Sequence, residues 1–220
     1  MKIGIIGAGN IGGNLARRLT AAGHDVAIAN SRGPETLADL AAETGATAVL
    51  AGDAAKDAEV VIVTIPLKTV ADLPDDILAG RAPGVVVIDT NNYYPQQRDG
   101  RIDAIEDDGI TESEWVSSQL GVPVVKAFNS IYAANIVGHA RPSGAADRLA
   151  LPISGDDADD KATVTALIDD VGFDVVDNGP LAESWRQQPG TPAYGRDLDV
   201  DRLKQALGEA SPERPADFRG

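Results

Sequence analysis

The 220-residue sequence contains no cysteine and only two histidines. Without cysteine the chain forms no disulfide, offers no thiolate nucleophile and cannot hold zinc through sulfur. His24 lies between a predicted helix end and the next strand, and His139 follows Gly138 at the end of another predicted helix. Both positions favour structural roles over acid–base catalysis. The sequence therefore offers no obvious catalytic triad.

Long apolar runs and an excess of positive charge are also missing. No stretch reaches the roughly 18–20 apolar residues of a membrane span. The apolar start of the chain is interrupted by Gly4 and Gly7 and has no basic segment before it, so no signal peptide is predicted. The formal net charge of −15 opposes binding to nucleic acid or to anionic lipid. We expect a cytoplasmic protein whose partners are small molecules and not membranes.

A glycine-rich turn opens the sequence. Residues 7–12, Gly-Ala-Gly-Asn-Ile-Gly, fit the pattern G-x-G-x-x-G, directly after an apolar strand and at the start of an amphipathic helix. This context is typical of a dinucleotide-binding turn. Gly7 permits the tight turn, Gly9 lets a pyrophosphate approach the backbone, and Gly12 lets the helix pack closely on the strand. The pyrophosphate would then lie at the positive end of the helix.

The end of the second predicted strand indicates which nicotinamide cofactor is bound. NAD sites usually carry Asp or Glu there to bind the ribose 2′-hydroxyl. This chain has Asn30, Ser31 and Arg32, which offer a hydroxyl and a guanidinium and no carboxylate. A guanidinium can bind a phosphate through two hydrogen bonds. We therefore expect NADP(H), the alternative being that Arg32 lies in a surface loop before the helix that starts at Pro34.

Apolar strands alternate with amphipathic helices through the whole chain. This predicts an α/β fold: a Rossmann-like, doubly wound, mostly parallel sheet with a smaller C-terminal α/β portion. We expect an NADP-binding Rossmann portion over 1–120, a smaller acceptor portion over 121–208 packed on it, and a frayed tail over 209–220. Helices are predicted over 67–78 and 111–120, and a long polar loop over 93–109. The acidic run 156–160 is typical of a helix start with acids on its first turn; a metal site is the alternative. Predicted strands cover 3–6, 25–30, 46–50, 59–66, 85–92, 123–129, 149–154 and 173–177.

Polar residues follow several of these strands. Ligands bind at the carboxyl ends of strands in such sheets, which places Thr64, Ile65 and Pro66 beside the cofactor. Asn91 and Asn129 also follow strands and could bind a second substrate, although both residues are common in turns. Lys126 is the best candidate for a proton donor if the protein reduces another small substrate.

Several segments together resemble NADPH-dependent reductases of coenzyme F-420, the 8-hydroxy-5-deazaflavin hydride carrier. They are residues 7–12, 30–32, 63–66, 125–129, 151–157 and 177–181, and the resemblance spans about residues 1–184. It implies that Gly9 to Gly12 hold the pyrophosphate, that Ser31 and Arg32 hold the 2′-phosphate, and that 129–134 face the second ring system. It also implies a homodimer. The segments 129–134 and 185–194 depart from the family's usual sequence.

The predicted activity is hydride transfer between NADP(H) and a deazaflavin (coenzyme F-420) or flavin-type acceptor. Such transfer needs few reactive side chains, because the cofactors carry the chemistry. The alternatives are reduction of another small substrate and a non-catalytic NADP(H) sensor; no metal is predicted. The predicted cofactor-binding residues are Gly7, Ala8, Gly9, Asn10, Ile11, Gly12, Asn30, Ser31, Arg32, Thr64, Ile65 and Pro66. The predicted acceptor-binding residues are Asn91, Asn129, Ser130 and Ala133.

Overall fold

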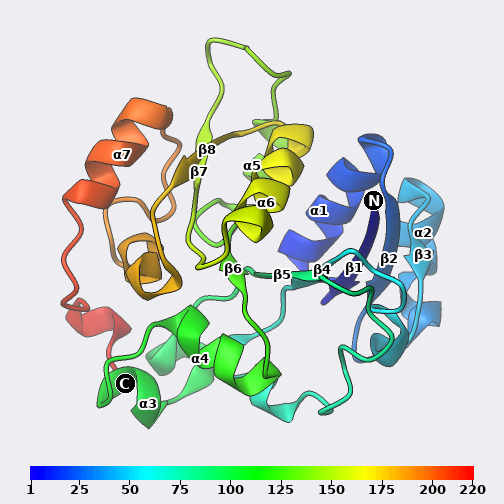
Figure 1. The fold of residues 1–220 in the computed structure, drawn as a ribbon, viewed down its shortest axis with the longest axis horizontal. Coiled ribbons are helices and arrows are strands. Elements are labelled where there is room, and N and C mark those ends of the chain that lie inside the picture. The colour runs from blue at the N-terminus through cyan, green and yellow to red at the C-terminus, as the bar shows by residue number, and fades with distance from the viewer.

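Six parallel strands form the central sheet of the computed structural model, which describes residues 1–220 (Figure 1). Their order, β3-β2-β1-β4-β5-β6, is that of a dinucleotide-binding Rossmann sheet and confirms the predicted fold class. The order reverses between β1 and β4, which opens a crevice at their carboxyl ends. The strands are β1 (Lys2–Ile6), β2 (Asp25–Ala29), β3 (Thr47–Ala48), β4 (Val60–Val63), β5 (Val86–Asp89) and β6 (Val125–Lys126).

Helices cover both faces of this sheet (Figure 1). One face carries α1 (Asn10–Ala21), α5 (Ala133–Gly138) and α6 (Ala158–Val171). The other carries α3 (Asp103–Glu106) and α4 (Glu112–Leu120). Successive side chains of a strand point to opposite faces. In β4, Val60 and Ile62 accordingly enter one hydrophobic core while Val61 and Val63 enter the other.

A second, two-stranded parallel sheet pairs β7 (Ala150–Ile153) with β8 (Asp174–Asp177). It packs against α7 (Val200–Gly208), while α2 (Ala38–Thr44) lies at the far edge of the main sheet. A bridge between Lys126 and Ser154 connects the two sheets. β6 and α6 follow residue 120 yet complete the main sheet and its core. A division at residue 120 therefore cuts through one continuous core.

Two local predictions were wrong, each for a physical reason. Residues 67–78 do not form a helix but a 3-10 turn over Leu67–Asp72, because Leu73 precedes a proline and is held extended. Residues 93–109 are not a plain loop and contain a π-helical turn, Pro95–Asp99, and α3. The buried carboxylate of Asp99 fixes that turn by accepting from the Tyr94 N–H (2.8 Å) and from Arg98.

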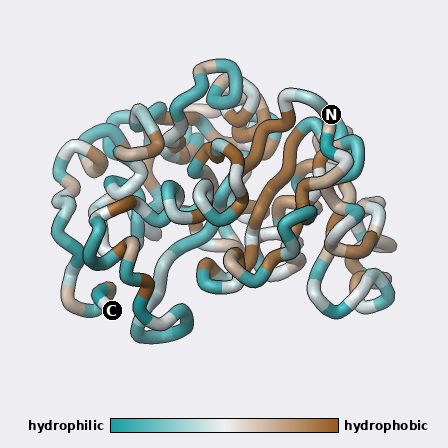
Figure 2. Tube along the Cα trace, turned by 60° about the horizontal axis from the view of Figure 1, so that its bottom comes forward, coloured by the Kyte–Doolittle hydropathy of each residue, from teal (hydrophilic) through white to brown (hydrophobic).

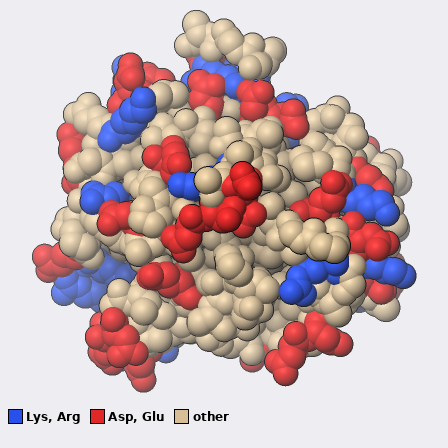
Figure 3. Space-filling model, in the orientation of Figure 1, with Lys and Arg blue, Asp and Glu red and all other residues tan.

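On the face shown in Figure 3, acidic side chains are spread out with basic side chains among them, and the chain as a whole carries a formal net charge of −15. The run 156–160 begins α6 as expected, because Asp157 accepts from the N–H groups of Asp159 and Asp160. The apolar segments gather in the strands, while the loops around them are mostly hydrophilic (Figure 2). No helix combines the length and apolarity needed to cross a bilayer.

The last ten residues return to the body of the protein beside α3 (Figure 1). The Gly220 N–H donates to Glu106 (2.8 Å), Gln96 donates to the Ala216 carbonyl (3.0 Å), and Arg214 pairs with Glu112 (3.1 Å). This arrangement differs from the frayed end that we expected. The sequence signal for fraying was polarity alone, and these polar side chains have partners elsewhere in the chain.

Candidate functional site

The three glycines of the opening turn are needed for different reasons. A Cβ on Gly7, whose φ is +115°, would lie 2.1 Å from the Thr64 carbonyl oxygen, and one on Gly12 would lie 1.9 Å from the Gly7 oxygen. Both positions are filled by the protein's own backbone. A Cβ on Gly9 would meet no protein atom within 4 Å. The packing of the chain therefore does not require glycine at position 9, and the space in front of it is open to a ligand.

Helix α1 begins at this open space. Gly9 is its N-cap and no side chain caps the helix, so the first N–H groups have no partner in the helix. Three hollows of about 400, 580 and 590 Å³ share Gly9 in their linings and therefore meet there. Free N–H groups and the helix dipole favour an anion at this point.

Arg32 lines two of these hollows. Its side chain is exposed and forms no ion pair or hydrogen bond within the chain, which leaves the guanidinium free. Asn30 shapes the loop, since its Oδ1 accepts from the Arg32 N–H (2.9 Å) and its Nδ2 donates to Thr36 (2.9 Å). Asn30 therefore holds the loop in place, and Ser31 and Arg32 line the hollow of about 580 Å³.

The hollow of about 400 Å³ lies at the carboxyl ends of the strands and brings together residues from distant parts of the chain. Most of the predicted crevice residues line it: Gly9, Asn10, Ile11, Thr64, Ile65, Pro66, Asn91, Asn129 and Ala133. Ser130 is buried beside it and is not part of the lining. Ile131 and Tyr132, from the segment 129–134 that was expected to face the second ring system, line it as well, and so does Arg98. The sequence did not single out the remaining lining residues, which are Thr90, Asn92, Tyr94, Phe128 and Tyr194. We call this hollow the crevice.

Asn91 carries a donor without a partner. Its Oδ1 accepts from the Ile65 N–H (3.1 Å), which connects the ends of β4 and β5, and its Nδ2 is buried with no hydrogen bond. The residue is 4% exposed and lines the crevice. A buried donor without a partner costs about 1–3 kcal/mol. A ligand acceptor in the crevice would remove that cost.

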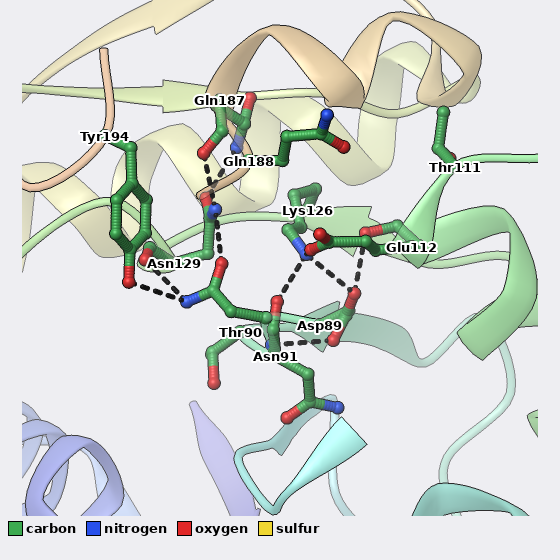
Figure 4. Close-up of polar contacts among 12 residues, drawn as sticks. Asp89, Thr90, Asn91, Thr111, Glu112, Lys126, Asn129, Gln187, Gln188 and Tyr194 are labelled. Carbon is green, nitrogen blue, oxygen red and sulfur yellow. Dashed lines mark hydrogen bonds and ion pairs between the residues drawn. The ribbon is translucent and has the colours of Figure 1, made fainter. Parts of the chain in front are cut away.

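Asn129 fixes a wall of the crevice (Figure 4). Its Nδ2 donates to Asn92 Oδ1 (3.0 Å) and to the Gln187 carbonyl (2.7 Å), while Gln187 Nε2 donates to Asn129 Oδ1 (2.9 Å). Gln187 is fully buried. Both donor hydrogens of Asn129 are therefore committed to the chain, and the residue positions the 185–194 segment. In the sequence, the only indication of a role for Gln187 was that residues 185–194 depart from the family's usual sequence.

Lys126 is buried away from the crevice lining (Figure 4). Its Nζ donates to the Asn91 carbonyl and lies 3.4 Å from Asp89 and 3.5 Å from Glu112. Arg214 from the C-terminal segment pairs with the other oxygen of Glu112 (3.1 Å). Two cations thus balance two carboxylates, and the lysine supports the strand end that carries Asn91. The geometry does not favour the proton-donor role considered for Lys126.

Comparison with known proteins agrees with this geometry. Residues 2–93 match the model of the family described as NADP oxidoreductase, coenzyme F-420-dependent. Residues 2–93 belong to this family. The resemblance predicted from the sequence is thereby confirmed, and the match supports an NAD(P)-dependent oxidoreductase.

Three proteins show how far the similarity extends. The solved structure of the hypothetical protein SMa0349 from Sinorhizobium meliloti is 36% identical, with 91% of this chain and 96% of that one covered and a TM-score of 0.76. A protein proposed to be an F-420-dependent NADP reductase, from Arthrobacter sp. FB24, is 26% identical over 84% of this chain and 87% of that one, with a TM-score of 0.65. The protein YjhV of Escherichia coli K12 is 42% identical over 73 residues, which are 33% of this chain and 53% of YjhV. The match thus spans about half the length of YjhV.

Proposed function

We propose that this protein transfers a hydride between NADP(H) and a deazaflavin such as coenzyme F-420, or a flavin-type acceptor. The observation that carries the proposal is the crevice itself. It meets the uncapped start of α1 at Gly9 and extends from there between aromatic and amide side chains. This continuity would bring a nicotinamide and a second ring system to the same place.

The residues present fit NADP(H). The open space at Gly9 and the N–H groups of α1 suit the pyrophosphate. The free guanidinium of Arg32, with the Ser31 hydroxyl beside it, suits the 2′-phosphate, and no acidic residue ends β2. The ends of β4 and β5 would hold the nicotinamide, since Thr64, Ile65 and Pro66 line the crevice. Asn91 Nδ2 is a donor without a partner in the chain and could donate a hydrogen bond to it.

Positioning is the main task of this chain. NADPH supplies the hydride, and direct transfer requires the two reacting atoms to be held about 3–3.5 Å apart. The hydrogen bonds of Asn129, Asn92 and Gln187 fix one wall of the crevice against the strand ends. Lys126 and its carboxylates fix another by holding the Asn91 carbonyl.

A turnover assay tests the proposal. Purified protein would be mixed with NADPH or NADH and with F-420, FMN, FAD or a ferric chelate. We expect NADPH to be consumed with F-420 or a flavin, and NADH to be a much poorer donor. Tight NADPH binding without oxidation by any of these acceptors would contradict the proposal. We further propose a homodimer, which sedimentation at micromolar concentration would test.

A further inference from the structure

Arg98 is the only charged side chain that lines the crevice. No carboxylate lines it, although the chain carries 34 aspartates and glutamates against 19 lysines and arginines. A chain with this excess of negative charge repels anions in general. A single cation in a crevice without carboxylates therefore creates a local site for negative charge. The proposed hydride transfer does not by itself require this cation.

A buried carboxylate holds the Arg98 side chain in place. Arg98 Nε and Nη2 donate to the two oxygens of Asp99 (2.8 and 2.9 Å), and Nη2 also donates to the Asn92 carbonyl (2.7 Å). The Asp99 side chain is fully buried and is itself fixed by the Tyr94 N–H (2.8 Å). Such a two-point pair sets the orientation of the guanidinium. A group that is ordered before its ligand arrives loses little freedom on binding.

The third nitrogen of the guanidinium remains available. Arg98 Nη1 has no hydrogen bond or ion pair within the chain, whereas Nε and Nη2 are both engaged. Asp99 is not part of the crevice lining, and Arg98 is. The pair therefore has its negative end in the protein interior and its positive end at the crevice, where Nη1 can donate to an anion.

Arg98 lies among the residues of the acceptor side. Its carbonyl partner, Asn92, donates through Nδ2 to the Asn129 carbonyl (2.9 Å). Its guanidinium carbon lies 5.2 Å from the centre of the Tyr94 ring, and the Tyr94 phenol is hydrogen-bonded to that of Tyr194. All five residues line the crevice. A ring that lies against Asn129 and Tyr194 would thus have its substituents within reach of Arg98.

We propose that Arg98 selects acceptors whose ring carries an anionic side chain, with a phosphate or a carboxylate. This inference rests on the proposed function and deepens it by naming the class of acceptor. Exposure decides which part of the acceptor meets Arg98. Its side chain is 37% exposed, whereas Asn91 and Asn129 are 4% and 3% exposed. An anion at a partly exposed guanidinium keeps part of its hydration, and burying it fully would cost far more. The ring therefore lies in the buried part of the crevice and its charged side chain at the rim.

Matched pairs of acceptors test the inference. FMN and riboflavin share one ring and differ in a phosphate, and F-420 is paired in the same way with its phosphate-free deazaflavin–ribityl fragment. The measurement is kcat/KM for each acceptor at saturating NADPH. We expect the wild type to prefer the anionic member about tenfold, a value between those of an exposed ion pair and a charge-assisted hydrogen bond. In Arg98→Gln the preference should fall below about twofold, with NADPH affinity changed by no more than that.

Two further variants separate charge from structure. Arg98→Lys keeps the positive charge and should keep most of the preference. Arg101→Gln removes the same charge at a matched control position. Arg101 is an exposed arginine that pairs with Asp103 and Asp107 and does not line the crevice. Arg101→Gln should keep the full preference, because the general field of the protein changes equally in the two glutamine variants.

The pair of acceptors that the wild-type protein turns over decides the outcome. NADPH oxidation with none of these acceptors refutes the proposed function and the inference together. Equal kcat/KM for both members of the active pair refutes the inference alone, as does a preference that survives in Arg98→Gln. The inference is also wrong if Arg98→Gln slows both members equally or weakens NADPH binding to match. It is wrong again if Arg98→Lys loses the preference as completely as Arg98→Gln, since the residue would then only maintain the turn.

Discussion

Replacing Gly9 with alanine should separate cofactor binding from folding. The backbone of Gly9 is extended, with φ of −75° and ψ of −165°, so alanine can adopt it. Its Cβ would meet no protein atom within 4 Å. The only expected cost is a poorer N-cap, about 1 kcal/mol, which lowers Tm by roughly 2–4 °C in a chain of this size.

The same Cβ would project into the space proposed for the pyrophosphate. Each charge-assisted hydrogen bond that is lost costs about 1.5–3 kcal/mol, which is roughly 10- to 150-fold in affinity. We expect Gly9→Ala to weaken NADPH binding at least tenfold, measured by fluorescence titration beside a thermal melt. Gly9→Ala that binds NADPH within twofold of the wild type would refute the assignment of this site.

Two neighbouring glycines serve as controls. A Cβ on Gly12 would lie 1.9 Å from the Gly7 oxygen, so Gly12→Ala should destabilise the fold by about 1–3 kcal/mol or more. A Cβ on Gly13 would meet only Arg17 Nη1, at 3.4 Å, and Leu40, at 3.9 Å. Gly13→Ala should therefore raise stability by about 0.5–1 kcal/mol, because alanine is the better helix former, and should keep NADPH binding.

Three further predictions concern other parts of the chain. Arg32→Ala should weaken NADPH binding by about 1.5–3 kcal/mol and NADH binding hardly at all, and an equal loss for both in titrations would contradict the 2′-phosphate assignment. Lys126→Met leaves two buried carboxylates with less compensation and should lower the free energy of unfolding in urea by about 3–5 kcal/mol, whereas an unchanged urea midpoint would show that the cluster contributes little. Burial raises the pKa of Tyr94 and Tyr194, so above about pH 10 the unfolded chain loses protons that the folded state keeps. The contribution of these phenols to stability should therefore be constant below about pH 10 and fall above it, less steeply in Tyr194→Phe, which urea unfolding at alkaline pH would measure.

The predictable part of the structure is the part governed by local pattern. The continuously apolar strand at 59–66 and the glycine turn were recognisable because a buried parallel strand and a tight turn each demand particular residues at particular positions. Leu67–Leu78 was mispredicted because the restriction imposed by Pro74 on Leu73 outweighed the helical pattern.

The less predictable part depends on contacts between distant segments. The strand pattern places Asn129 at the crevice, yet nothing in the sequence shows that its amide hydrogen-bonds Gln187, 58 positions later, both as donor and as acceptor. Likewise Arg214 lies in a polar tail and reaches Glu112, 102 positions earlier. Polarity predicts exposure only while a side chain has no partner, and these partners are supplied by the tertiary fold.

Direct hydride transfer between the two ligands is the central claim, and isotope transfer tests it most directly. NADPH carrying deuterium at the transferred position of C4 would be mixed with F-420 and the protein in ordinary water, and the reduced deazaflavin analysed by mass spectrometry and NMR. The account predicts that the deuterium appears on the ring carbon of the acceptor and that its transfer slows the reaction. Deuterium that is lost to water, or NADPH that remains unoxidised although it is bound, would contradict the account.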